Sequence, residues 1–345
     1  MSDCGQRSGR RWGLAILLLA VGGGLPLWAA ELTVHGPLDE ALLAPVLRLF
    51  TQETGHAVRY VRDEPEALLR RLGTEGMATT ADVLLGVDST DLRAARQAGL
   101  LRAVRSKPLA MQISPQYRDS DDFWYGLTVR ARVLLYARAR VSPAELTGYE
   151  SLAESRWRKR LCMDVSVHAG GHALLTALLA HWGFERSLEW AQGVAANLAN
   201  EPQGNDRNQM RALVLGVCDV AVVNTQDYVR ILRSEREEDR IAVRQIGMVW
   251  PDQGAWGAII DVAGAGVTAH TRQADVARQF LEFLVGDAAQ RLLAAQTDAY
   301  PVVPGIPVAS ALLNLGAFKA DQVNLAAPDG SEETVARILA ASGWK

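Results

Sequence analysis

The sequence predicts an α/β protein made of two lobes on either side of a cleft, and three observations support this prediction. Strand-like and helix-like segments alternate in the order typical of doubly wound α/β domains. One extended segment, 123–136, is too long for one small sheet and is expected to pass between two domains. The chain has 345 residues, and a domain usually takes about 100–200.

The first α/β unit is expected before residue 100. The run 81–87 is almost continuously apolar, which is typical of a strand covered on both faces. Pro37 and Gly55 bracket the first helix, because Pro favours the start of a helix and Gly its end. The expected strands are 31–35, 56–61 and 81–87, and the expected helices are 38–50, 64–73 and 91–99.

The second α/β unit follows the long extended segment. Its expected strands are 161–167 and 219–223, and its expected helices are 173–182, 187–197 and 206–215. A strand region at 257–267, helices at 271–285 and 286–296, an extended segment at 300–303 and a helix at 332–342 complete the chain.

The order of these elements also predicts how the chain divides between the lobes. Lobe I is expected to hold 31–116 and 252–304, and lobe II 117–251 and 305–345. The segments near 117–136 and 245–258 would then cross between the lobes and form the hinge.

Residues 1–30 have the pattern of a secretory signal peptide. Arginines precede a short apolar run at 12–21, and small residues end the segment at Ala29 and Ala30. The alternative is a membrane anchor, but glycines at 22–24 and Pro26 interrupt the run before the roughly 20 residues that a spanning helix needs. We therefore expect export with cleavage near Ala29 or Ala30.

Export bears on the two cysteines that remain in the mature chain. Cys162 and Cys218 lie in or beside expected strands. An oxidising compartment allows a disulfide between them. Two unlinked buried thiols are the alternative, and the sequence leaves both open.

Charge and motifs narrow the function classes. Lys and Arg number 36 against 39 Asp and Glu, a net charge of −3, which argues against a general affinity for nucleic acid. The sequence contains no phosphate-binding loop, no Gly-x-Ser-x-Gly nucleophile elbow and no His-Glu-x-x-His motif. A binding protein is therefore favoured over an enzyme, and no cofactor is expected beyond a possible bound metal ion.

Several short motifs resemble those of the periplasmic ferric-iron-binding proteins of ABC transporters. The likeness runs in order from about residue 32 to 344 and implies the two-lobed type II periplasmic-binding-protein fold, with a ligand cleft between the lobes. The motifs that carry it are at 50–55, 81–85, 97–100, 130–136, 202–204, 209–212, 216–219, 224–225, 264–268, 280–284, 289–290 and 300–304.

The resemblance fails at the iron ligands. The family binds ferric iron through tyrosinates, often with a histidine or a carboxylate. Its adjacent tyrosine pair corresponds here to Gln226 and Asp227, with Tyr228 just beyond. Tyrosinate suits Fe(III), whereas amide, carboxylate and imidazole make a different site. The family's His-Tyr pair corresponds to Asp39 and Glu40, and its second-lobe tyrosine to Gly171, between His168 and His172.

Loops at the carboxyl ends of the strands are expected to converge on the cleft. This rule and the resemblance select ten ligand-binding candidates, of which Asp227 and His168 are the candidate metal ligands. Alternation along one strand would place both arginines on one face, where they suit an anion. The candidates are Asp39, Glu40, Asp88, Arg130, Arg132, His168, His172, Gln226, Asp227 and Tyr228.

Each candidate also has a structural interpretation. Asp39 and Glu40 would complement a helix dipole, and Asp227 would be a turn or cap residue. The histidines would flank a helix-capping loop, and the arginines would form surface salt bridges. Aromatic residues would either line the cleft or only pack; these are Tyr125, Tyr228 and Trp256.

Three functions compete on this basis. The first is a periplasmic carrier, expected to be a monomer, that delivers a metal ion or a small organic anion to an ABC transporter permease. The second is a ligand sensor that presents its bound form to a membrane signalling receptor. The third is a secreted enzyme such as a phosphatase, which the missing catalytic motifs disfavour.

Overall fold

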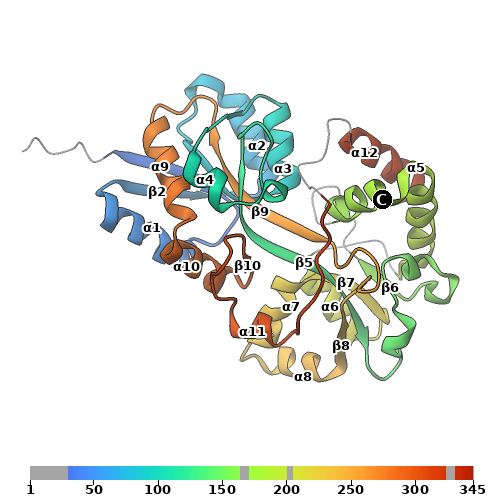
Figure 1. The fold of residues 1–345 in the computed structure, drawn as a ribbon. Coiled ribbons are helices and arrows are strands. Elements are labelled where there is room, and N and C mark those ends of the chain that lie inside the picture. The colour runs from blue at the N-terminus through green and yellow to red at the C-terminus, as the bar shows by residue number, and fades with distance from the viewer. Residues whose placement is uncertain (1–29, 164–170, 200–204, 324–330, 345) are drawn as a thin grey trace, which may run out of the picture.

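The computed structural model describes residues 30–163, 171–199, 205–323 and 331–344. These residues form a two-lobed α/β molecule, in which helices cover a central mixed sheet (Figure 1). His168 falls outside the described residues, so its expected place in the site is not observed.

The strands follow the order β2-β1-β3-β9-β5-β7-β6, with β10 and β8 paired to β5 and β4 paired to β9. In the first half, β1 lies parallel to both β2 and β3. In the second half, β6 lies parallel to β7. The strands are β1 Glu31–Gly36, β2 Ala57–Arg62, β3 Val83–Asp88, β4 Leu101–Arg102, β5 Tyr125–Ala137, β6 Leu161–Met163, β7 Val220–Asn224, β8 Ile246–Val249, β9 Ile260–Thr268 and β10 Tyr300–Pro301.

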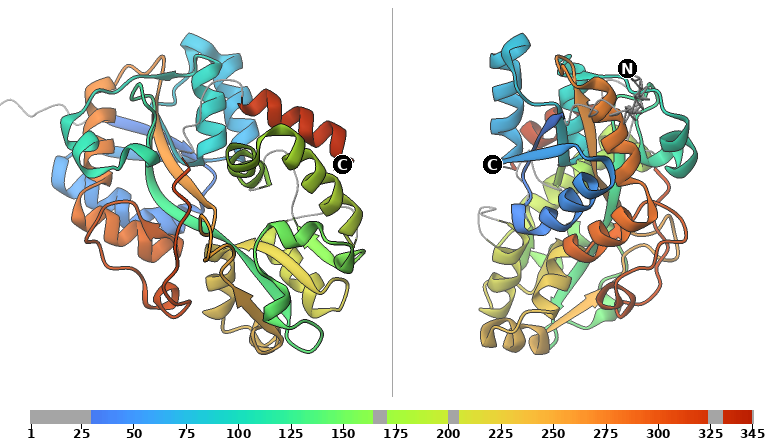
Figure 2. Two further views of the ribbon diagram at one scale, coloured as in Figure 1. Left: turned by 45° about the vertical axis from the view of Figure 1, so that its right-hand side comes forward. Right: turned by 90° about the vertical axis from the view of Figure 1, so that its left-hand side faces the viewer.

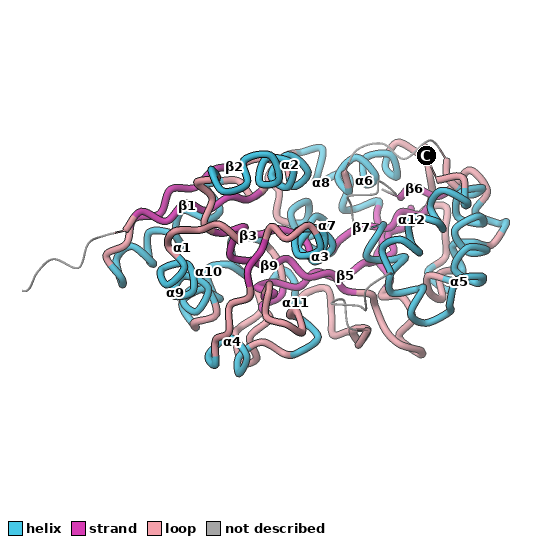
Figure 3. Tube along the Cα trace, turned by 90° about the horizontal axis from the view of Figure 1, so that it is seen from above, coloured by secondary structure: helices cyan, strands magenta, loops and turns pink. Residues whose placement is uncertain are grey.

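The long strand β5 joins the two halves of the sheet. Its residues 125–131 pair with β9, and its residues 132–136 pair with β7. Figure 3 shows it running from the half that holds β1 and β3 to the half that holds β6 and β7. The extended segment expected at 123–136 is therefore observed as one strand that pairs in both halves of the sheet.

The helices cover both faces of the sheet, as two views of the ribbon show (Figure 2). They are α1 Glu40–Thr54, α2 Pro65–Glu75, α3 Ser89–Gln97, α4 Lys107–Gln112, α5 Gly171–Asn197, α6 Asp206–Val214, α7 Thr225–Leu232, α8 Glu237–Gln245, α9 Ala274–Leu284, α10 Asp287–Thr297, α11 Ser310–Leu313 and α12 Ser331–Ser342. Among the described residues, none of these helices is long and apolar enough to span a membrane.

Separate apolar cores form on the two sides of β5. The first half has two cores, a large one built from residues between 32 and 131 together with 258–302 and a smaller one built from residues between 72 and 124. The opposite half has two cores, one on each face of its strands, and α12 contributes Val335 and Ile338 to one of them. The chain therefore leaves the first half at β5 and returns to it near residue 258.

Local differences from the sequence expectations have physical causes. The first helix begins at Glu40 rather than Leu38, because the Asp39 side chain accepts a hydrogen bond from the Ala41 N–H and caps it. Helices α7 and α8 were not predicted. The sequence of α8 is mostly charged, so it carries little apolar periodicity. Gly183, at φ 75°, separates two helical stretches within α5, near the expected break.

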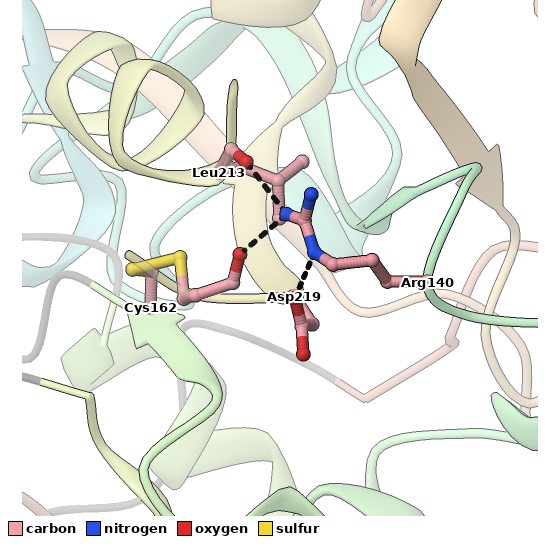
Figure 4. Close-up of a disulfide and its surroundings, with 5 residues drawn as sticks. Arg140, Cys162, Leu213 and Asp219 are labelled. Atoms are coloured by element: carbon pink, nitrogen blue, oxygen red, sulfur yellow. Dashed lines mark hydrogen bonds and ion pairs between the residues drawn. A yellow bond between two sulfur atoms is a disulfide. The ribbon is translucent and has the colours of Figure 1, made fainter. Parts of the chain in front are cut away.

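The structure resolves the open question about the cysteines. Cys162 lies in β6 and Cys218 just before the parallel strand β7, with their Cα atoms 5.8 Å apart and their sulfurs bonded. Arg140 stands beside this bridge, where its guanidinium donates to the carbonyl oxygens of Leu213 and Cys218 and pairs with Asp219 (Figure 4). The disulfide thus ties together two neighbouring strands that lead toward the cleft.

Candidate functional site

A small pocket of about 40 Å³ lies where the two halves of the molecule meet. Leu38, from the loop after β1, and Gly86 of β3 line it from the first half. Gln226, in the first turn of α7, lines it from the second half, and Arg130 of β5 lies between them. Segments at or just after the ends of strands in both halves therefore meet at one place, as the strand-end rule predicts.

Arg130 is the centre of a buried ion-pair cluster. Its Nη2 lies 2.6 Å from Oδ2 of Asp261 and also contacts a carboxylate oxygen of Asp88. Asp261 accepts further hydrogen bonds from the Val262 N–H at 2.8 Å and from the Ser89 hydroxyl at 3.3 Å. The Asp261 side chain is 2% exposed. Two carboxylates thus share one guanidinium at the base of the pocket.

The pKa values of the two carboxylates are shifted in opposite directions. Burial, with the added repulsion of Asp261, raises the pKa of Asp88 to about 6 despite the nearby Arg130. Burial acts on Asp261 as well, but the ion pair and hydrogen bonds with Arg130 outweigh it and lower the pKa of Asp261. Asp88 is therefore the member of the pair that gains or loses a proton near neutral pH.

Asp91 adds a third carboxylate to this region. It lies one turn after Asp88 on α3 and is 5% exposed. Burial, followed by repulsion from Asp88 and Asp261, raises the pKa of Asp91 to about 7. Its charge is therefore unfavourable in the folded state.

We expect Asp91→Asn to flatten the dependence of stability on pH. The folded-state pKa of Asp91 lies above the unfolded value of 3.8, so the free energy of unfolding falls as pH rises from about 4 to about 7. In the variant, this fall in the free energy of unfolding, on the order of a few kcal/mol, should be absent. Urea unfolding followed across that pH range measures it. Glu40→Gln, at an exposed position, is the control and should keep the wild-type slope; an unchanged slope in Asp91→Asn would contradict the assignment.

Arg132 belongs to a neighbouring cluster on the same strand. Its Nη1 lies 3.6 Å from Oδ1 of Asp206, at the start of α6. Asp206 Oδ2 accepts a hydrogen bond from the Asn224 N–H at 2.7 Å, and burial raises its pKa although Arg132 opposes the shift. The Thr225 hydroxyl accepts from the Ala131 N–H at 3.1 Å. These contacts fix the start of α7 against β5.

The three candidates after β7 do not share one environment. They lie in the first turn of α7 rather than in a loop. Gln226 lines the pocket, while Asp227 is paired with Arg230 on the next turn at 3.2 Å. Tyr228 is 5% exposed and packs in an apolar core. Positions 226 and 228 are about 200° apart around a helix, so the structure does not bring Tyr228 to the pocket.

The remaining candidates also lie apart from the pocket. Asp39 and Glu40 are exposed, and Asp39 takes the capping role; its neighbour Leu38 lines the pocket instead. His172 is buried in the first turn of α5, where its carbonyl accepts from the Thr176 hydroxyl at 2.9 Å. The Tyr125 hydroxyl donates to the Val104 carbonyl at 2.7 Å, and Trp256 stacks on His181 with ring centroids 4.3 Å apart.

Sequence reasoning missed Asp261 and Asp206, which hold the two arginines. Asp261 is an acidic residue inside an otherwise apolar strand, and this is a signal that a buried partner exists. Asp206 in the first turn of a helix is common enough to carry no such signal. Within the described ranges, no three His, Cys, Asp or Glu residues are grouped closely enough to hold a metal ion.

Comparison with known proteins gives consistent matches along most of the chain. A family model described as bacterial extracellular solute-binding protein matches residues 33–296. Iron uptake protein A2 of Synechocystis is 36% identical over 290 residues, which cover 84% of each chain. A Trichodesmium IdiA (FutA) structure, described as a complex with iron and citrate ligands, is 30% identical, with a TM-score of 0.86, and covers 92% of this chain and 100% of its own. The ferric binding protein from Campylobacter jejuni is 26% identical, with a TM-score of 0.84, covering 91% and 100%.

Proposed function

This chain belongs to the bacterial extracellular solute-binding proteins, as its motifs indicated, and we propose that it delivers a solute from the periplasm to the permease of an ABC importer. The family consists of binding proteins of ABC iron transport rather than enzymes. The observation that carries the proposal is the pocket lined by Leu38 and Gly86 from one half and Gln226 from the other. A solute bound there contacts both halves and favours their closure.

The hinge proposal follows from the same strands. We propose lobe I over 31–116 and 252–304 and lobe II over 117–251 and 305–345. The separate apolar cores on either side of β5 support two lobes, but they place residues 125–131 with lobe I and Ile259 with lobe II, so the crossing points lie within β5 and near residue 259. At the boundary, the Arg132 N–H donates to the Ile259 carbonyl at 2.8 Å, and the Tyr149 hydroxyl accepts from the Ile259 N–H at 3.0 Å. Bending at this point would move the lobes without breaking either core.

The cargo proposed is a metal ion that arrives with a small organic anion. The resemblance places Gln226 at the family's tyrosine pair, and Gln226 lines the pocket, so an amide oxygen would stand there in place of a tyrosinate. An accompanying anion would supply the missing donors and would compete with Asp88 and Asp261 for the guanidinium of Arg130, which lines the pocket. Iron and citrate, the ligands named for the Trichodesmium relative, have this chemistry, and the lobes would have to open at the hinge to admit them, because the pocket holds only about 40 Å³.

Adding ferric iron is expected to produce no visible tyrosinate-to-iron charge-transfer band. Burial raises the pKa of six of the seven tyrosines, which opposes the deprotonation that such a band requires. The measurement is an absorption spectrum of the iron-treated protein. A strong band that disappears in Tyr60→Phe, whose hydroxyl donates to the Leu38 carbonyl beside the pocket, would contradict the expectation.

Thermal unfolding with and without candidate solutes tests the cargo. Ferric citrate should raise the melting temperature, because a ligand that binds only the folded state stabilises it by about 2.7 kcal/mol at a hundredfold excess over Kd. Gln226→Leu should weaken this shift, because Gln226 lines the pocket, whereas Glu40→Gln should leave it unchanged. The cargo proposal fails if neither ferric citrate, citrate nor the chlorides of Mn²⁺ and Zn²⁺ change the melting temperature.

An uptake experiment in cells distinguishes transport from sensing. Deleting the gene should reduce uptake of radiolabelled iron supplied as citrate, and the wild-type gene should restore it. Unchanged uptake, together with a solute-dependent loss of gene regulation, would favour the receptor-linked sensor instead.

Export is the last part of the proposal. Residues 1–30 would direct secretion, and the Cys162–Cys218 disulfide is consistent with an oxidising compartment. Mass spectrometry of the protein from a periplasmic extract should give a mature chain that begins at Ala30 or Glu31. A chain that retains residues 1–29 would contradict cleavage.

A further inference from the structure

A second and larger pocket, of about 510 Å³, opens between α7, β8 and α11. It shares no lining residue with the cleft pocket. Leu232, Met248 and Leu315 form its apolar walls. The Trp250 indole N–H donates to the Leu315 carbonyl at 2.9 Å and holds one wall in place. The size lies within the roughly 300–1,000 Å³ of small-molecule sites.

Tyr228 contributes the first polar group of this pocket. Its side chain is almost fully buried, yet its hydroxyl makes no hydrogen bond to any residue that the structure describes. The hydroxyl is not among the fully buried polar atoms without a partner, so it is accessible from the pocket, where a bound molecule or water can complete its hydrogen bonding. Burial raises the pKa of Tyr228, so the hydroxyl remains a hydrogen-bond donor near neutral pH.

Two arginines contribute positive charge. Arg138 Nε donates to the Ile246 carbonyl at 2.8 Å, and no acidic side chain in the described part of the chain forms an ion pair with it. Arg233 also lines the pocket but is paired with Asp298. The pocket therefore carries one guanidinium whose charge is not compensated.

We propose that this pocket binds a small carboxylate with an apolar body. The carboxylate pairs with Arg138 and accepts a hydrogen bond from the Tyr228 hydroxyl, while the apolar body lies against Leu232, Met248 and Leu315. A neutral molecule of the same shape leaves Arg138 without a counter-charge. An inorganic anion leaves the apolar walls exposed to water.

The test is fluorescence titration of the full mature protein, disulfide intact, with 2-naphthoate. Its neutral counterpart, 2-naphthalenemethanol, should bind about tenfold more weakly or worse, because it lacks the charge-assisted bond. Arg138→Gln should weaken the binding of naphthoate by about tenfold. Tyr228→Phe, which keeps the ring, should weaken it by about three- to tenfold. Arg244→Gln is the matched control and should leave Kd unchanged, because Arg244 lines a neighbouring pocket with Arg138 but not this one.

Several outcomes would overturn the proposal. They are the absence of naphthoate binding, equal affinity for the neutral alcohol, or wild-type affinity in both Arg138→Gln and Tyr228→Phe. Displacement of naphthoate by ferric citrate would show that naphthoate binds in the cleft pocket, and this result would also overturn the proposal. Thermal unfolding of the unliganded variants establishes that each is folded. Because the two pockets share no residue, failure of this proposal leaves the cargo proposal intact, and the reverse also holds.

Discussion

Arg130→Met is expected to lower the free energy of unfolding by about 3–5 kcal/mol, measured by urea denaturation at pH 7.5. The substitution keeps most of the side-chain volume but leaves Asp88 and Asp261 together without their shared cation. The loss comes mainly from the uncompensated carboxylates, since Asp261 is buried and hydrogen-bonded in place. The variant should also lose binding of the cargo, because Arg130 lines the cleft pocket.

The pH dependence of Arg130→Met identifies the cause. Without Arg130, the folded-state pKa values of Asp88 and Asp261 should both lie above 3.8. The variant's loss of unfolding free energy relative to the wild type should therefore shrink as pH falls from about 7 toward 4. Arg230→Met, which removes the half-exposed partner of Asp227, is the control and should cost less than about 1 kcal/mol. A deficit that does not change with pH would show that lost packing, and not charge, destabilises the variant.

Removing the disulfide is expected to have an effect of similar size. The bridge closes a segment with a sequence separation of 56 residues, for which chain entropy gives a stabilisation of about 4 kcal/mol. Cys162→Ala combined with Cys218→Ala should therefore lower both the free energy of unfolding and the melting temperature. Because β6 and β7 both lead toward the cleft, cargo affinity should fall as well.

Reductant provides the control for this effect. Dithiothreitol should destabilise the wild-type protein toward the level of the double variant and leave the double variant unchanged. A wild-type protein whose unfolding midpoint does not respond, although thiol titration shows the bridge to be reduced, would contradict the expected contribution.

The overall fold could be predicted because local pattern and global arrangement agree. The apolar strands, the bracketed helices and above all the long segment at 123–136 each reflect burial that is visible in the sequence. The same reasoning missed α8, whose charged sequence is helical because its few apolar residues, such as Ala242, pack on a core supplied by distant segments.

The cleft could be predicted only in part. The strand-end rule and the motifs selected Arg130 and Gln226, and both line one pocket. They did not show that Asp261 shares Arg130 with Asp88, since positions 130 and 261 meet only through the pairing of β5 with β9. Nor did they show that Tyr228 turns away from Gln226, which depends on α7 beginning at Thr225 rather than after a loop.

The sequence by itself determined the two-lobed α/β class, the crossing strand and the family, because these depend on local periodicity and on short motifs in a fixed order. The tertiary structure alone decided that Cys162 and Cys218 are joined, that Asp39 caps a helix, and that Arg130 holds two carboxylates. Each of these depends on the distance between groups or on the exact residue at which a helix begins. A sequence pattern constrains burial and periodicity, but the pairing of distant strands brings the charged groups together.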